Sequence, residues 1–362
     1  MIYFLSIYCL VIILSFTDFN KKYKRLGAIA IIILLAMLAG FRNMGGMDFL
    51  FYKDLYNRLA LNYLSSEFGY ALFNNLFSSL GFSFNFFLFV YTFISVYFMV
   101  SFLEKYTPFP KFSILFYMAS YFFYYNMVLN RQMICITAVL WVLFLWNKNK
   151  LCSLFVLFSA FLFHQSIIVI LPFLLIFEMI KNSKGVICWG GYFIFAIVIT
   201  LVVNPIDFSN YISFIPGLSF VTVRTLDYFS KTEVSLYTLN KLEYLKMFLM
   251  LLILLPCLKT ILKNKENKIW VFFYFTGLIV MFWTRNIEIL FRVFVYFDLS
   301  LLFLLPLCLN IFITKFPSEQ KKTVLLFSYG LMGILALASI YYRISNFDHG
   351  VFLLYKFYFL EV

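Results

Sequence analysis

The sequence is a succession of apolar runs, each about 15 to 20 residues long, separated by short clusters of basic residues. Of its 362 residues, 64% are hydrophobic and only 12% are charged, whereas a soluble domain carries about 25% charged residues. A run of about 20 apolar residues lets one helix cross the hydrocarbon core of a bilayer. The pattern predicts an all-α polytopic membrane protein. Because the spans use up the length, we expect one integral membrane domain over residues 1–362.

The apolar runs predict about twelve transmembrane helices. They cover residues 2–17, 26–41, 83–103, 112–128, 130–146, 151–163, 166–180, 186–203, 243–259, 269–283, 289–306 and 323–342. The two runs on either side of His164 are short for a bilayer. They are compatible with tilted helices, with re-entrant segments or with one broken helix.

The basic residues predict how the chain is oriented, because Lys and Arg are enriched in cytoplasmic loops. With the N-terminus outside, the cytoplasmic loops hold 16 Lys and one Arg, and the outer side holds five Lys and seven Arg. Those inner loops are residues 21–25, 105–111, 148–150, 181–184, 259–268 and 315–322. The net charge of +13 fits this bias, so we expect no nucleic-acid partner.

The arginines of the outer side indicate an anionic ligand there. A guanidinium group has a planar fork of donors that binds phosphate or carboxylate at two points and stays charged. Alternatively, each arginine reaches lipid phosphates or pairs with a nearby carboxylate.

The stretch AGFRNMGGMDFLFYKDLYN, residues 39–57, gathers charge directly after an apolar run. Its Gly45-Gly46 pair permits a sharp turn. Asp48, Tyr52 and Tyr56 follow at helical spacing and would share one face. We expect residues 42–82 to form an outward-facing periplasmic loop with interfacial helices. An ordinary interfacial helix with an aromatic belt would explain the tyrosines equally well.

Two further outer-side breaks carry polar residues. Asn130-Arg131-Gln132 interrupts two apolar runs with almost no loop, so Arg131 lies close to hydrocarbon, where charge is costly and usually functional. His164 lies at another break, and an imidazole there can exchange a proton near neutral pH. A tight turn around Arg131 and a structural role for His164 are the alternatives.

A fourth cluster lies in FWTRNIEILFRVFVYFD, residues 282–298. Arg292 and Tyr296 would share a helix face, and Glu288 and Arg292 are spaced as an i, i+4 salt bridge. We expect residues 204–242 to form a second outward-facing loop that acts as a lid.

Several motifs are absent from the sequence. It contains no D-x-D motif, no Walker loop, no G-x-S-x-G and no cluster of histidines. The six cysteines lie in apolar runs without C-x-x-C spacing, as buried small hydrophobes do. We therefore expect no metal and no cofactor.

Together these motifs resemble the EpsG family, which overlaps the Wzy-type O-antigen and exopolysaccharide polymerases. The matching pieces are F-R-x-x-x-G-x-x-D-x-x-x-Y (Phe41, Arg42, Gly46, Asp48, Tyr52), E-x-G-Y (Glu67, Gly69, Tyr70), N-R-Q (Asn130 to Gln132), F-H-Q-S (Phe163 to Ser166) and R-x-x-x-Y (Arg292, Tyr296). They follow the family's order across most of the chain.

The resemblance implies glycosyl transfer at the periplasmic face of the bacterial inner membrane, by a fold similar to the metal-independent glycosyltransferases of the GT-C type. The donor and the acceptor would be undecaprenyl-diphosphate-linked glycans. Membrane lipids and a chain-length regulator protein would be further partners.

Fixed positive charge placed where the diphosphate leaves would lower the barrier of such a transfer. Arg131, Arg292 and Arg42 are the expected diphosphate ligands. His164, Asp48 and Glu67 are the expected catalytic residues, one of which serves as the base. Tyr52, Tyr70 and Tyr296 are expected to bind glycan.

Three other functions remain open at this point. A transporter or flippase of lipid-linked glycan would also place scarce charges around a cavity. A membrane acyltransferase acting on surface sugars would use His164 as its base. A structural role in an assembly complex would leave the outer arginines unexplained.

Overall fold

The computed structural model describes residues 2–42, 47–57, 67–182, 241–284 and 288–346. All regular elements in these ranges are helical. The chain divides into two compact units, one of residues 1–168 with 302–362 and one of residues 169–301.

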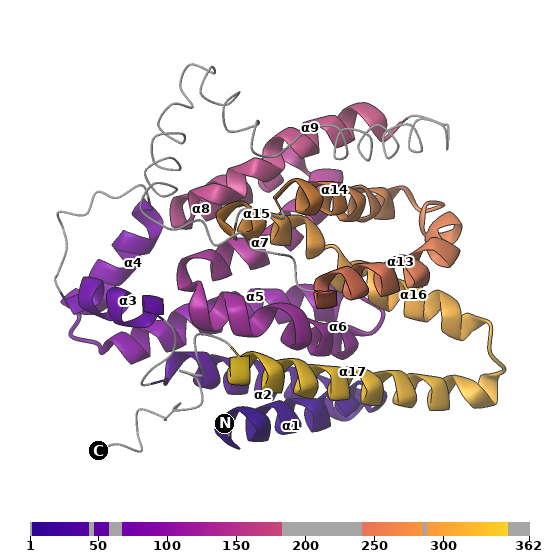
Figure 1. The fold of residues 1–362 in the computed structure, drawn as a ribbon, viewed down its shortest axis with the longest axis horizontal. Helices are drawn as coiled ribbons and strands as arrows, with labels where there is room; N and C mark the ends of the chain where they lie inside the picture. Colours follow the sequence, from indigo (N-terminus) through magenta and orange to yellow (C-terminus); the bar gives the residue numbers. More distant parts are fainter. Residues whose placement is uncertain (1, 43–46, 58–66, 183–240, 285–287, 347–362) are drawn as a thin grey trace. The chain divides into compact units, whose positions relative to one another are not determined.

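Most of the described helices belong to the first unit, and Figure 1 labels them along the chain. Its elements are α1 (Ile2–Ser15), η1 (Phe16–Phe19), α2 (Lys21–Gly40), α3 (Met47–Asn57), α4 (Phe68–Ser79), α5 (Phe84–Tyr106), α6 (Pro110–Tyr117), η2 (Met118–Val128), η3 (Asn130–Gln132), α7 (Met133–Lys148), α8 (Lys150–Phe163) and α17 (Ser318–Asn346). The boundaries of the two units in the sequence fall within η4 (Gln165–Val169) and at the first residue of α16 (Leu301–Thr314).

Local signals in the sequence set the starts of several helices. The side chains of Asn20, Ser83 and Asn149 accept hydrogen bonds from the first backbone N–H groups of α2, α5 and α8. Pro110 begins α6, where its fixed φ suits the first helical position.

The second unit consists of α9 (Ile170–Ile180), α13 (Lys241–Ile261), η5 (Lys265–Asn267), α14 (Lys268–Thr284) and α15 (Glu288–Asp298). Within it, α14 packs against α15. Lys246 Nζ donates to Asp298 Oδ2 over 2.7 Å, which joins α13 to the end of α15.

Five helical stretches of the described residues are long and apolar enough to cross a bilayer. They are Ile2–Phe19, Lys21–Gly40, Phe84–Tyr106, Arg292–Thr314 and Ser318–Ser345. Shorter apolar helices cover Met133–Lys148, Lys150–Phe163, Gln165–Ile180 and Phe248–Ile261. The chain is therefore an all-α integral membrane protein, as the sequence predicts.

The predicted spans coincide with single helices or with pairs of consecutive helices, except that 186–203 lies outside the described residues. The total of about twelve stays a prediction. The break predicted at His164 is present, because α8 ends there and η4 follows.

Helices α2 and α5 pack closely, and a Cβ at Gly40 would overlap the backbone of Phe89. Lys24 and Glu104 lie at one end of this pair, and Arg42 and Asn85 lie at the other. Eighteen residues separate Lys24 from Arg42, a rise of about 27 Å in a helix. This is close to the roughly 30 Å thickness of the hydrocarbon core of a bilayer, so the two polar ends of the α2–α5 pair are about as far apart as the two faces of that core.

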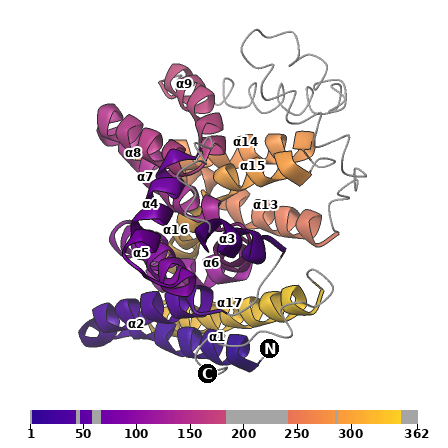
Figure 2. The ribbon, with the colours of Figure 1, turned by 90° about the vertical axis from the view of Figure 1, so that its left-hand side faces the viewer.

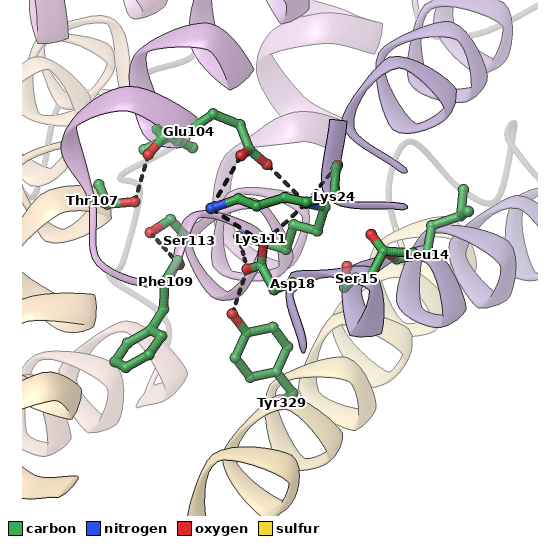
Figure 3. Close-up of polar contacts among 12 residues, drawn as sticks. Leu14, Ser15, Asp18, Lys24, Glu104, Thr107, Phe109, Lys111, Ser113 and Tyr329 are labelled. Atoms are coloured by element: carbon green, nitrogen blue, oxygen red, sulfur yellow. Dashed lines mark hydrogen bonds and ion pairs between the residues drawn. The ribbon is translucent and has the colours of Figure 1, made fainter. Parts of the chain in front are cut away.

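A buried polar network occupies the end with Lys24 and Glu104 (Figure 3). Lys111 is 0% exposed, and its ammonium group donates to Asp18 Oδ1 at 2.9 Å, Glu104 Oε1 at 2.9 Å and the Lys24 carbonyl at 3.1 Å. The second oxygen of Asp18 accepts a hydrogen bond of 2.7 Å from Tyr329 of α17. We call these five residues the Lys111 network. It joins η1, α2, α5, α6 and α17.

Helix α1 contacts both α2 and α17, and the three helices lie side by side in both views (Figures 1 and 2). Helix α17 also packs against α6 and the π-helical segment η2. The C-terminal span therefore supports the segment that leads toward Arg131.

Candidate functional site

Five polar residues meet at the end of the first unit opposite the Lys111 network. The Glu67 carboxylate binds two partners: Arg131 Nη1 lies 2.5 Å from Oε2, and His164 Nδ1 lies 2.6 Å from Oε1. Arg131 Nε donates to Tyr52 Oη over 2.9 Å, and Gln132 Nε2 lies 2.9 Å from His164 Nε2. We call these residues the Glu67 cluster. It brings together four of the predicted site residues, which are Glu67, Arg131, His164 and Tyr52.

Each member of the cluster lies where a helix begins or ends, except Tyr52, which lies in the middle of α3. Arg131 is on the 3₁₀ turn η3, between η2 and α7, and His164 caps the C-terminus of α8 in an extended conformation. Glu67 directly precedes α4, and its carbonyl accepts a hydrogen bond of 3.1 Å from the N–H of Ala71. These breaks allow polar side chains from separate helices to meet without placing charge inside a span.

The glycine of the E-x-G-Y motif permits α4 to approach α8. A Cβ at Gly69 would lie 3.0 Å from the carbonyl oxygen of Leu162 and 3.1 Å from its carbon. Leu162 is two residues before His164 and Gly69 two after Glu67. The close approach of the two backbones therefore sets the distance between these two side chains.

An aromatic core fixes α3 and α4 against α5. Tyr52 and Tyr70 are 3% and 2% exposed, and their ring centroids are 6.0 Å apart. The Arg131 guanidinium lies over the Tyr52 ring at 5.2 Å, so Tyr52 holds Arg131 by a cation–π contact as well as a hydrogen bond. The buried members of this core are Phe49, Tyr52, Tyr56, Tyr70, Phe84, Phe87, Leu88, Tyr91 and Met133.

The charges of the cluster stabilise one another. Burial by itself would raise the pKa of the Glu67 carboxyl, but the hydrogen bond from His164 and the charge of Arg131 outweigh it and hold that pKa below its usual value. Burial would likewise lower the pKa of the Arg131 guanidinium, yet Tyr52 and Glu67 raise it above its usual value. The carboxylate and the guanidinium are both charged at neutral pH.

Arg131 is the most accessible charged group of the cluster. Its side chain is 36% exposed, against 21% for His164 and 9% for Glu67. Its Nε and Nη1 atoms donate within the cluster, whereas Nη2 makes no hydrogen bond to the residues that the structure describes. One face of a well-fixed cation is thus available to an anion.

The contacts of His164 define its tautomer. Because the Gln132 amide nitrogen is a donor, the facing Nε2 of His164 accepts, and the ring proton is on Nδ1, toward Glu67. Gln132 is 5% exposed, and its Oε1 atom has no hydrogen-bond partner in the described part of the chain. If the amide turned over, that oxygen would accept from a protonated Nε2.

The other predicted site residues are placed differently. Arg42 is 0% exposed; it donates to the Ala39 carbonyl and lies 5.3 Å from the Phe49 ring. Asp48 is on α3, but its side chain is outside the described part. Arg292 and the fully buried Tyr296 are on α15 in the second unit.

The roles predicted for these residues stay predictions, as do the glycan-stacking roles of Tyr52 and Tyr70. The lid expected at residues 204–242 has all but its last two residues outside the described ranges, and the periplasmic position of residues 42–82 is untested.

Sequence reasoning did not assign a role to Gln132, although it belongs to the N-R-Q motif. Its position directly after Arg131 was the available signal. The Lys111 network was also missed, because Lys111 was counted only as an orientation signal among the inner-loop lysines.

The EpsG family model matches residues 25–357, nearly the whole chain. The chain belongs to the EpsG family. The EpsG family is a family of Wzy-type polymerases, so the resemblance predicted from the ordered motifs is confirmed. No curated protein and no solved structure matches this EpsG chain.

Proposed function

We propose that this EpsG protein is a polysaccharide polymerase that joins undecaprenyl-diphosphate-linked oligosaccharide repeat units by metal-independent glycosyl transfer. The reaction takes place at the periplasmic face of the bacterial inner membrane, in a GT-C-like fold of about twelve spans. The observation that carries the proposal is the Glu67 cluster, which holds a partly exposed guanidinium beside a carboxylate–imidazole pair.

Arg131 binds the diphosphate of the donor glycan. In the transfer, the bond between the anomeric carbon and the diphosphate oxygen breaks, and its electron pair leaves with the diphosphate. Arg131 Nη2 donates to an oxygen of that group, while Tyr52 and Glu67 keep the guanidinium in place. A donor fixed before the reaction stabilises the developing charge without reorganisation.

His164 is the base for the acceptor sugar. Glu67 has both oxygens engaged and a lowered pKa, so it is a poor proton acceptor. His164 carries its proton on Nδ1 and leaves Nε2 to take one, as in carboxylate–histidine pairs that orient a base. The acceptor hydroxyl displaces the Gln132 amide from Nε2, transfers its proton there and bonds through its oxygen to the anomeric carbon. The imidazolium is stabilised by Glu67 and then loses its proton to water.

The experiment is a glycan ladder from a strain that lacks the gene. Wild type, Arg131→Ala and Lys322→Ala are returned at matched membrane levels, and the surface polysaccharide is separated on a gel. Lys322→Ala is the control because it removes an exposed basic residue near the N-terminus of α17, outside the Glu67 cluster. We expect wild type and Lys322→Ala to restore the ladder, while Arg131→Ala leaves single-repeat glycan. Removing one donor of this kind costs roughly 10²–10³ in rate.

The position of the intermediates separates polymerisation from transport. Loss of a polymerase leaves lipid-linked repeat units in the periplasm, whereas loss of a flippase leaves them in the cytoplasm. A ladder that survives the deletion, with no second polymerase present, would reject the proposal.

A further inference from the structure

Three consecutive carbonyl groups at the start of η2 accept hydrogen bonds from side chains of α1 and α17. Tyr8 Oη donates to the Met118 carbonyl at 3.4 Å, Ser339 Oγ to the Ala119 carbonyl at 2.5 Å, and Arg343 Nη2 to the Ser120 carbonyl at 3.3 Å. Arg343 Nε also donates to Ser339 Oγ over 3.3 Å, so these two donors act as a pair. No part of the proposed reaction uses them.

The accepting segment has an unusual backbone. Residues Met118–Val128 form a π-helix, and its last turn closes with a hydrogen bond of 3.0 Å from Leu129 N to the Tyr124 carbonyl. Extended π-helices are rare, and short ones occur frequently at functional sites. Side chains that bond to helix carbonyls change the backbone ladder locally. The three donors are therefore placed where they favour the wider helix over the α form.

The helical form of η2 decides which way the next residues face. A π-helix fits extra residues into its turns. Each extra residue rotates all following side chains about the helix axis by about 100°, compared with where an α-helix would place them. Arg131 follows the end of η2 by three residues. Asn126 links η2 to the start of α7. Its Oδ1 atom accepts a hydrogen bond of 2.5 Å from Tyr117 Oη, and its Nδ2 atom lies 3.8 Å from Met133 Sδ.

We infer that Tyr8, Ser339 and Arg343 hold η2 in its π-helical form and thereby position Arg131 in the Glu67 cluster. They are positioning residues, since no hydrogen bond joins them to the cluster within the described part of the chain. The effect on activity rests on the proposed function, whereas the effect on η2 does not. It also gives a role to Arg343, a charged residue in the last turn of α17.

The test uses the purified full-length protein in lipid nanodiscs and two readouts. Hydrogen–deuterium exchange measures the protection of the backbone amides of residues 118–132. The rate at which a lipid-linked oligosaccharide is converted measures activity. The variants are Arg343→Met, Ser339→Ala and Arg343→Lys. Tyr329→Phe is the matched control, because it removes a hydrogen bond from the same helix at the Lys111 network.

We expect Arg343→Met and Ser339→Ala to speed exchange in residues 118–132 about 10-fold, and Tyr329→Phe to leave it unchanged. Turnover should fall between about 10-fold and 100-fold in Arg343→Met, because small misplacement of a catalytic group is costly. Arg343→Lys, which retains a donor, should recover most of it. In an Arg131→Ala background, Arg343→Met should cost nothing further, since it acts through Arg131.

The inference would be overturned if Arg343→Met left hydrogen exchange in residues 118–132 unchanged. It would also be overturned if the losses of turnover from Arg131→Ala and Arg343→Met multiplied in the variant that carries both. Equal effects of Tyr329→Phe and Arg343→Met on η2 would also overturn it, by showing general loosening of α17. If the wild type transfers no glycan but the variants change hydrogen exchange as expected, the polymerase proposal fails. The inference that Tyr8, Ser339 and Arg343 stabilise the π-helical form of η2 is then still supported.

Discussion

His164 Nδ1 lies 2.6 Å from Glu67 Oε1, although 97 residues separate them in the chain. The contact joins the end of α8 to the start of α4. Because the other oxygen of Glu67 binds Arg131, one carboxylate fixes both an imidazole and a guanidinium. The positions of the imidazole and the guanidinium therefore depend on the same side chain.

Replacing Glu67 by Gln should abolish most activity while the protein still folds. The amide offers one acceptor oxygen and one donor group, so either Arg131 or His164 would face a donor. We expect turnover to fall by up to about 10⁴-fold, the loss seen when the carboxylate that orients a catalytic histidine is replaced by an amide. Turnover of lipid-linked glycan measures it. Glu178→Gln is the control, since Glu178 forms an ion pair with Lys181 at the C-terminal end of α9, outside the Glu67 cluster; equal losses in both variants would contradict a special role for Glu67.

Stability should depend on pH through Glu67. Its pKa is lower in the folded protein than in the unfolded chain. Its contribution is therefore complete above the usual carboxyl pKa of about 4.3 and is lost as the pH falls through the lower folded value. Thermal unfolding in detergent should show wild type more stable than Glu67→Gln at pH 5.5, with the difference in stability closing below about pH 4. A gap that stays constant at acidic pH would show that the ion pairs do not stabilise the fold.

Adding one methyl group at Gly69 should separate the two halves of the cluster. A Cβ there meets the backbone of Leu162, which cannot move as a flexible side chain would. We expect Gly69→Ala to lower the turnover per molecule of protein and to lower the free energy of unfolding by about 1–3 kcal/mol. Gly330→Ala is the matched control on α17, where a Cβ would meet nothing within 4 Å. Wild-type turnover in Gly69→Ala would mean that this approach does not set the Glu67–His164 distance.

Removing the central cation of the Lys111 network should destabilise the protein strongly. In Lys111→Met, Asp18 and Glu104 lose the buried ammonium that pairs them, and uncompensated buried charge costs about 3–5 kcal/mol. Tyr329→Phe removes only one hydrogen bond of the same network and should cost about 1 kcal/mol. Thermal unfolding of purified variants compares them. Similar melting temperatures for both variants would indicate that the carboxylates of Asp18 and Glu104 remain stable in the fold without the Lys111 ammonium.

The sequence alone determined the class of protein and much of its local structure. Apolar runs are visible without contacts, since a span must be apolar along its whole length, and so the helices fall where the runs predicted them. Breaks at Asn130-Arg131-Gln132 and at His164 were visible for the same reason. The ordered short motifs indicated the family before any contact was known.

Only the tertiary structure decided which polar residues work together. Glu67, Arg131 and His164 come from three breaks far apart in the chain, and helix packing, including the approach at Gly69, brings them within hydrogen-bond distance. The same packing buried Arg42 against Phe49 and turned Lys111 from an orientation signal into the centre of an ion network. Local pattern fixes where a membrane helix begins and ends, because the bilayer acts on each helix separately. Which helix ends meet depends on side-chain packing between helices, and no stretch of the sequence contains that information by itself.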